Sequence, residues 1–152
     1  MGALAAGSSA VPPWGMEPAG PAELHAICRS LPETELGVTW GDVPTYVVPR
    51  GPKGRGFVLF RHPRKDAIDP ATGEPYEDLV VLRCGTPDDR EALLADERLP
   101  FFTIDHFRNT DFLAVLVQQS RLHEIDKDEL RELVTDAWLA VAPKRLARQH
   151  FP

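Results

Sequence analysis

The short spacing between apolar segments is the feature that most constrains the fold of this sequence. Runs rich in β-branched, aromatic and other apolar residues occur at residues 36–40, 45–48, 57–61, 76–84 and 112–118. The first two connections, at residues 41–44 and 49–56, are shorter than the stretch of about a dozen residues that joins parallel strands. Both connections contain Gly and Pro, which is typical of turns. The sequence therefore predicts an antiparallel sheet.

A short helix is predicted ahead of the first strand. Pro21 follows Gly20 and suits the first helical position, and Pro32 ends the segment. The apolar residues at helical spacing within it are Leu24, Ile27, Cys28 and Leu31. This spacing predicts one buried helical face.

A second helix is predicted over residues 87–95. Thr86 can cap its first turn, and Pro87 suits the first helical position. After it, residues 101–104 are predicted to form a strand or a bridge, and residues 105–110 a polar turn. The run at 112–118 is almost entirely apolar, which favours a central strand that is covered on both faces.

The longest helix is predicted to begin after Asp126, which can cap it. Ile125 and Leu130 stand where a hydrophobic staple would close around that cap. Pro143 interrupts the apolar stripe of the helix, and residues 144–150 can add a short basic helix.

Together these elements predict an α+β domain in which helices pack on one face of an antiparallel sheet. The chain has 152 residues, enough for one such domain. Residues 1–20 contain 14 Gly, Ala, Ser or Pro and no Lys or Arg, so we expect a flexible leader there, which Trp14 could dock on the domain. The domain itself is expected to span residues 21–152.

Two cysteines, Cys28 and Cys84, are too few for a disulfide framework and lie within apolar patterns. They fit a reducing, cytoplasmic setting. No apolar run is long enough to span a bilayer, so no membrane partner is expected.

Three stretches resemble the MmcQ/YjbR family. They are the Trp-Gly-Asp-Val-Pro-Thr-Tyr turn at residues 40–46, the strand and helix at 79–94, and the closing segment at 136–146. The resemblance covers roughly residues 22–148. It implies a compact α+β fold of the YjbR/CyaY type, related to bacterial frataxin and described as a double wing. Proteins of this family commonly carry the label "DNA-binding", so the resemblance also implies a possible DNA partner.

The distribution of charge is uneven along the chain. Seventeen Lys and Arg against 23 Asp and Glu give a formal net charge of −6, which argues against a protein that coats nucleic acid over its whole surface. Nine cations nevertheless fall in two segments without acids, residues 50–65 and 143–152, which leaves −15 for the rest. The nine are Arg50, Lys53, Arg55, Arg61, Arg64, Lys65, Lys144, Arg145 and Arg148.

These cations predict weak, salt-sensitive contact with DNA phosphates, mainly through a basic hairpin. A structural explanation stands beside this hypothesis, because exposed hairpins are often charged to stay soluble and to discourage edge pairing. The alternative function is a protein- or small-ligand-binding domain with no role in nucleic-acid binding. Its pocket would be lined by Trp40, Phe102, His106 and Arg108.

No motif for catalysis, cofactor binding or metal binding occurs. The five histidines are scattered, and no glycine-rich phosphate loop or nucleophile elbow is present. We therefore expect a non-enzymatic binding module with no cofactor and no metal. An enzyme of unrecognised type would need converging polar side chains, which a sequence does not reveal.

Overall fold

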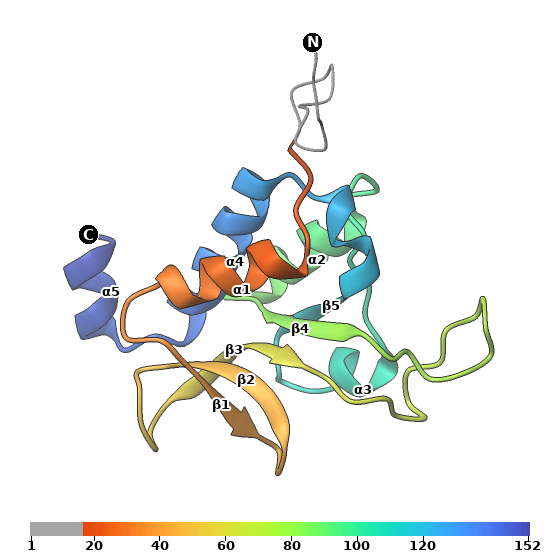
Figure 1. Cartoon of the computed structure of the whole chain (residues 1–152), viewed down its shortest axis with the longest axis horizontal. Helices are drawn as coiled ribbons and strands as arrows, with labels where there is room; N and C mark the ends of the chain where they lie inside the picture. Colours follow the sequence, from red (N-terminus) through yellow and green to blue (C-terminus); the bar gives the residue numbers. More distant parts are fainter. Residues whose placement is uncertain (1–16) are drawn as a thin grey trace.

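The computed structural model of the protein describes residues 17–152 and has a five-stranded sheet at its centre (Figure 1). The strands are β1 (Glu35–Thr39), β2 (Val43–Val48), β3 (Arg55–Phe60), β4 (Leu79–Arg83) and β5 (Ala114–Gln118). Their order in the sheet is the order of the chain, and every neighbouring pair is antiparallel. The predicted α+β class and the antiparallel sheet are confirmed.

Helices cover one face of this sheet. The helical elements are α1 (Pro21–Ser30), α2 (Pro87–Ala95), α3 (Asp105–Arg108), η2 (Gln119–Glu124), α4 (Lys127–Val141) and α5 (Lys144–His150). Figure 1 shows α1, α2 and α4 gathered on the same side of the sheet. They bury a large core that includes Tyr46, Phe57 and Trp138, which we call the helix-side core. Within residues 17–152, no helix combines the length and the apolar composition that crossing a bilayer requires.

The other face of the sheet has a thinner cover. A second core there joins Val43 and Leu59 to Val81, Leu116 and Phe107. Phe107 comes from α3, which is only one turn long. Both faces of the sheet are therefore buried, but the second face depends on a short helix and on loop residues.

The caps predicted for two helices are present. The side chain of Thr86 accepts a hydrogen bond from the amide of Asp89 at 3.1 Å. The side chain of Asp126 accepts one from the amide of Asp128 at 3.0 Å. Local capping chemistry thus fixes the first residues of α2 and α4.

Two predictions for residues 101–118 are wrong. Residues 105–110 begin with helix α3 instead of a turn, because the carbonyl of Ile104 accepts from the amides of Phe107 and Arg108, and Phe107 buries itself in the second core. The apolar run at 112–118 supplies an edge strand, not a central one. Its residues are buried because both cores cover β5, and Phe102 bridges to Leu116 along its outer edge.

The expected leader is described only from residue 17 onward, and residues 1–16, with Trp14, lie outside the described part. The amide of Glu17 donates to the carboxylate of Asp126 at 2.8 Å. The amide of Ala19 donates to the carbonyl of Ile125 at 2.9 Å, and Ala19 is buried. Residues 17–19 thus run beside the start of α4.

A β-bulge bends the pairing of β2 with β3. Tyr46 pairs with Val58 and Val47 pairs with Gly56, so Phe57 has no partner across the ladder. Phe57 and Val58 therefore both enter the helix-side core, although they are adjacent in sequence. A Cβ atom on Gly56 would lie 2.6 Å from Cγ2 of the buried Thr45, which explains the glycine at this position.

Replacing Gly56 by Ala is expected to destabilise the protein by about 1–3 kcal/mol, because the added methyl group overpacks the bulge. Gly37→Ala is the matched control, since its Cβ would meet only Val47 Cγ2, at 4.0 Å. Urea denaturation of both variants measures the difference. Equal stabilities for the two variants would contradict the role given to Gly56.

Candidate anion-binding pocket

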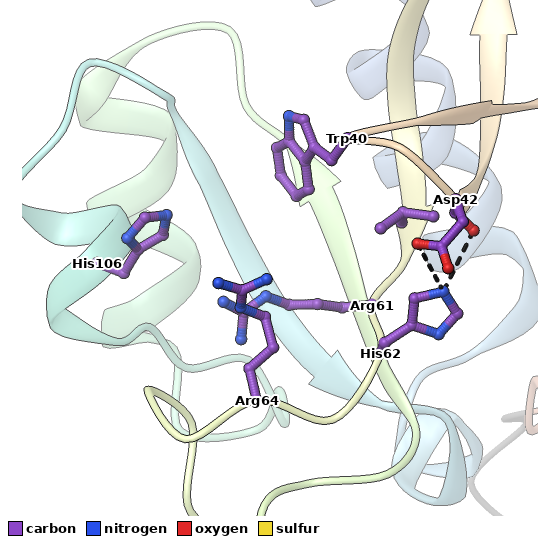
Figure 2. Close-up of a pocket in the computed structure, with 7 residues that line it drawn as sticks. Trp40, Asp42, Arg61, His62, Arg64 and His106 are labelled. Atoms are coloured by element: carbon purple, nitrogen blue, oxygen red, sulfur yellow. Dashed lines mark hydrogen bonds and ion pairs between the residues drawn. The ribbon is translucent and has the colours of Figure 1, made fainter.

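A pocket of about 300 Å³ opens where the β1–β2 turn meets the end of β3. Its lining residues are Trp40, Asp42, Val43, Arg61, His62, Arg64 and His106. We call it the Arg61 pocket. Figure 2 shows the side chains of Arg61 and Arg64 directed into the space between Trp40 and His106.

The β1–β2 turn supplies one wall of the pocket. Trp40 and Gly41 both have positive φ, at 51° and 90°, so the chain reverses sharply after β1. This backbone turns the indole of Trp40 onto the second core, where its ring centre lies 5.5 Å from that of Phe112 and 6.4 Å from that of Phe107. These three rings form what we call the aromatic trio. Trp40 is still 52% exposed, so part of its indole faces the pocket.

Arg61 follows directly after β3 and turns inward. The residue is only 5% exposed, and its guanidinium carbon lies 5.4 Å from the ring centre of Phe107. Its Nη2 donates to Oδ2 of Asp66 at 2.7 Å. Its Nη1 is also buried but has no hydrogen-bond partner. One half of the guanidinium is thus satisfied and the other half is left with unused donors.

Asp66 holds Arg61 in this position. The hydrogen bond from Arg61 and its positive charge lower the pKa of Asp66 below the usual 3.8, so the carboxylate stays ionised well into the acid range. The loop that carries Asp66 is fixed by backbone bonds from Ala67 to Arg64 and from Tyr76 to Ala67. Ala67 is itself buried against the second core.

The remaining polar groups of the pocket lie nearer to solvent. Arg64 is exposed, and Nε2 of His62 lies 3.5 Å from Oδ1 of Asp42, whose side chain is 88% exposed. Arg61 and Arg64 therefore line the pocket together with the carboxylate of Asp42, while the carboxylate of Asp66 pairs with Nη2 of Arg61 and leaves its Nη1 free. The lining is suited to an anion, because a guanidinium presents paired N–H donors that match a carboxylate or a phosphate.

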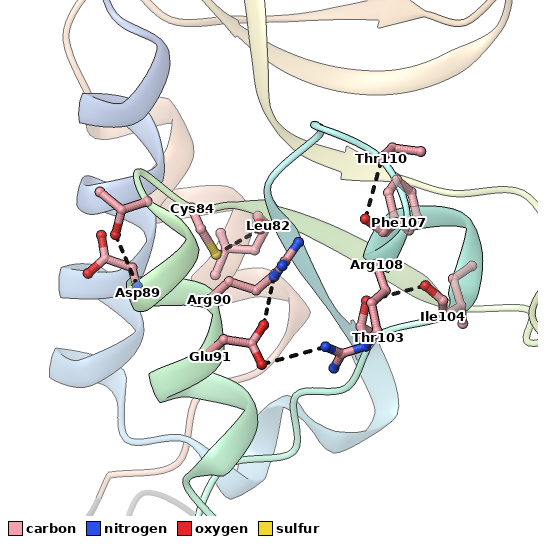
Figure 3. A network of polar contacts seen from close by, with 11 residues as sticks. Leu82, Cys84, Asp89, Arg90, Glu91, Thr103, Ile104, Phe107, Arg108 and Thr110 are labelled. Carbon is pink, nitrogen blue, oxygen red and sulfur yellow. Dashed lines mark hydrogen bonds and ion pairs between the residues drawn. The ribbon is translucent and has the colours of Figure 1, made fainter.

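An ion-pair network ties α3 to α2 and so fixes the far wall of the pocket (Figure 3). Glu91 of α2 accepts from Nε of Arg90 at 3.0 Å and lies 3.5 Å from Nη1 of Arg108 on α3. In the same short helix, Phe107 supports Arg61, and His106 lines the pocket. Glu91 thus connects the helix-side layer to the residues that shape the site.

The structure divides the nine predicted DNA-contacting residues between two places. Arg50, Lys53 and Arg55 lie on the β2–β3 hairpin, and Lys144, Arg145 and Arg148 lie on α5. Both elements are at the left of Figure 1. Arg61, Arg64 and Lys65 follow the opposite end of β3. Arg61 is buried and does not contribute to an exposed surface.

Of the four predicted pocket residues, Trp40 and His106 line the Arg61 pocket. Phe102 instead packs on Tyr76, with ring centres 5.2 Å apart, and Arg108 is directed to Glu91. Sequence reasoning missed Arg61 as a pocket residue, although Asp66 five positions later is the kind of partner that a buried arginine needs.

Replacing Asp66 by Asn is expected to lower the free energy of unfolding by about 2–3 kcal/mol at neutral pH, because it removes the negative charge that pairs with the buried Arg61. The folded-state pKa of Asp66 is lowered, so its stabilising effect exists above the unfolded pKa of 3.8 and disappears as pH falls through the lower folded value. The difference in unfolding free energy between wild type and variant should therefore begin to shrink as pH falls below about 5, and it should still be shrinking below pH 3.8.

Urea denaturation across this pH range measures that gap. Asp111→Asn, at an exposed position after α3, is the control for loss of one carboxylate. A gap of constant size at every pH would contradict the ion pair with Arg61.

Comparison with known proteins finds a family whose model matches most of this chain. A family model described as YjbR matches residues 29–140. Uncharacterized protein Mb2600 of Mycobacterium bovis and uncharacterized protein Rv2570 of Mycobacterium tuberculosis are each 40% identical over 100 residues. The alignment covers 62% of this chain and 74% of each relative. No solved structure matches the chain significantly.

Proposed function

The chain belongs to the YjbR family, and from the geometry of its pocket we propose that it is a non-enzymatic binding module for a small anion. The names of its relatives state no activity that could be assigned to this chain. The proposal therefore comes from the residues themselves. The sequence left a small-ligand-binding domain as the alternative function, and the arginines of the pocket indicate that this ligand is an anion.

One observation carries the proposal, namely the buried and unpartnered Nη1 of Arg61. Buried polar groups in native proteins almost always have a hydrogen-bond partner, and a buried charge without one is costly. Asp66 accepts from Nη2 only. A small rotation of the guanidinium toward the pocket would let an anion accept from Nη1 and so complete the set of bonds.

The surrounding residues favour an anion of small size. Arg64 can approach the same ligand from the solvent side, and Trp40 provides an apolar wall. A pocket of about 300 Å³ is at the lower end of the range for small-molecule sites. A carboxylate or phosphate group with a short organic body fits this volume and this charge.

Inorganic phosphate and acetate are the probes for this function. Either anion is expected to raise the melting temperature of the wild-type protein, because a ligand that binds only the folded state stabilises it. Arg61→Lys keeps one positive charge but loses the paired donors, and it should weaken binding about 10-fold to 100-fold.

Arg64→Gln tests the pocket without disturbing a buried group and should also weaken binding. Arg98→Gln is the matched control, because it removes an exposed arginine that follows α2 and does not line the pocket. If both probes bind the two pocket variants as well as they bind the wild type, the proposal is wrong.

DNA binding is the second candidate, and the position of two basic elements favours it. The β2–β3 hairpin and α5 both lie at the left of Figure 1 and carry six cations. All six are exposed, although Arg50 lies 3.9 Å from Glu33. Such a surface would contact phosphates without reading base sequence.

Binding of a duplex DNA measured over a series of salt concentrations tests this candidate. Replacing Lys53, Lys144 and Arg148 by Ala should weaken binding at low salt and lower the salt-dependence slope by about three. A variant with Ala at Arg98, Arg121 and Lys127 removes the same formal charge elsewhere and is the control. Equal affinity and equal slope for wild type and the first variant would exclude DNA contact through this surface.

A further inference from the structure

A second arginine lies over another ring of the aromatic trio. The guanidinium carbon of Arg83, at the end of β4, lies 4.1 Å from the ring centre of Phe112. Its Nε is buried and has no hydrogen-bond partner. Like Arg61, Arg83 lies over a ring of the trio and has a buried donor without a partner, but Arg83 is only partly buried.

This arginine borders its own pocket of about 220 Å³. Trp40, Arg55 and Phe112 also line it, and none of the described residues that line it is acidic. Within residues 17–152, no carboxylate lies within ion-pairing distance of Arg83 or Arg55. Burial and the charge of Arg55 lower the pKa of Arg83 from its usual value, as expected for a cation without a counter-ion.

The two pockets share Trp40 as a lining residue. Arg61 lies over Phe107, Phe107 contacts Phe112, and Arg83 lies over Phe112. The distances are 5.4 Å from the Arg61 guanidinium carbon to the Phe107 ring centre, 5.6 Å between the two ring centres, and 4.1 Å from the Phe112 ring centre to the Arg83 guanidinium carbon. The two guanidinium carbons are therefore within about 15 Å of each other. One small organic molecule can span such a distance.

We infer that Arg83 and Arg55 form a second anion subsite and that the ligand is an organic dianion, with one anionic group at Arg61 and the other at Arg83. This inference rests on the proposed function for its Arg61 end. The body of the ligand would pass along the exposed indole of Trp40, which lines both pockets. Carboxylate and phosphate groups share the chemistry that both arginines recognise.

Calorimetric titration with anions of graded length tests this inference. The probes are acetate, the linear dicarboxylates from succinate to sebacate, and the alkane bisphosphonates of the same lengths. One length is expected to bind about tenfold or more tightly than acetate, because its second group binds intramolecularly. Whichever of the two series gives the tighter optimum identifies the anionic group.

Variants at each end separate the two subsites. Arg83→Gln should abolish the advantage of the optimal dianion while acetate still binds. Arg55→Gln, at an exposed position, should reduce the same advantage and serves as the test if Arg83→Gln does not fold. Arg98→Gln should leave all the affinities unchanged, because this exposed arginine lines neither pocket.

The possible failures are distinguishable. If acetate binds in an Arg61-dependent way and no dianion binds more tightly, the second subsite is wrong and the proposed function stands. If the advantage survives both Arg83→Gln and Arg55→Gln, the second group binds elsewhere and the inference is overturned. If no anion binds at all, the inference and the proposed function both fall.

Discussion

The second face of the sheet is covered by little more than one helical turn and the aromatic trio, and this thin cover determines where the charges of the protein can lie. Helices on the other face bury Trp138, Tyr46 and Phe57 almost completely. On the second face, the guanidinium groups of Arg61 and Arg83 add to the cover by lying over the rings of Phe107 and Phe112. Arginine can do this because its stem is apolar and its guanidinium stacks on aromatic rings. Two positive groups are thus drawn into this layer, where Asp66 pairs with Arg61 but, within residues 17–152, no carboxylate pairs with Arg83.

The sequence predicted those parts of the fold that depend on local chemistry. The caps at Thr86 and Asp126 were predictable because a capping side chain bonds within its own turn. The antiparallel pairing was predictable because the first connections leave no room for a crossover. The turn at residues 105–110 was mispredicted because α3 forms around Phe107, and the value of burying that ring is known only once the sheet exists.

The site was less predictable for a related reason. Nine cations in two segments suggested one surface, but β3 carries the chain about 3.3 Å per residue and separates Arg55 from Arg64. Trp40 and His106 were identified as pocket residues, whereas Arg61 was assigned to a surface that it does not reach. Whether an arginine after a strand points outward or inward depends on what covers the next layer, and a linear charge pattern does not contain that information.

Support for the site extends into the helix-side layer. Glu91 joins α2 to Arg108, and α3 in turn presents both Phe107 beneath Arg61 and His106 at the pocket wall. Because α3 is too short to be stable alone, its position depends on such outside contacts. A ligand that binds Arg61 would therefore contact a residue that rests on α3, a helix that Glu91 of α2 already holds in place.

Trp40 is the residue whose placement the fold itself explains least. A non-glycine residue with φ of 51° costs on the order of 1–3 kcal/mol, and half of this large ring remains in solvent. Contacts with Phe107 and Phe112 offset part of that cost, yet a smaller apolar residue on a relaxed backbone could cover the same rings. What such a residue could not do is line the Arg61 pocket and the Arg83 pocket at once. Backbone strain is concentrated at functional sites and aromatic side chains are common in ligand pockets, so the strain and exposure of Trp40 support the proposal that a bound molecule meets both arginines beside it.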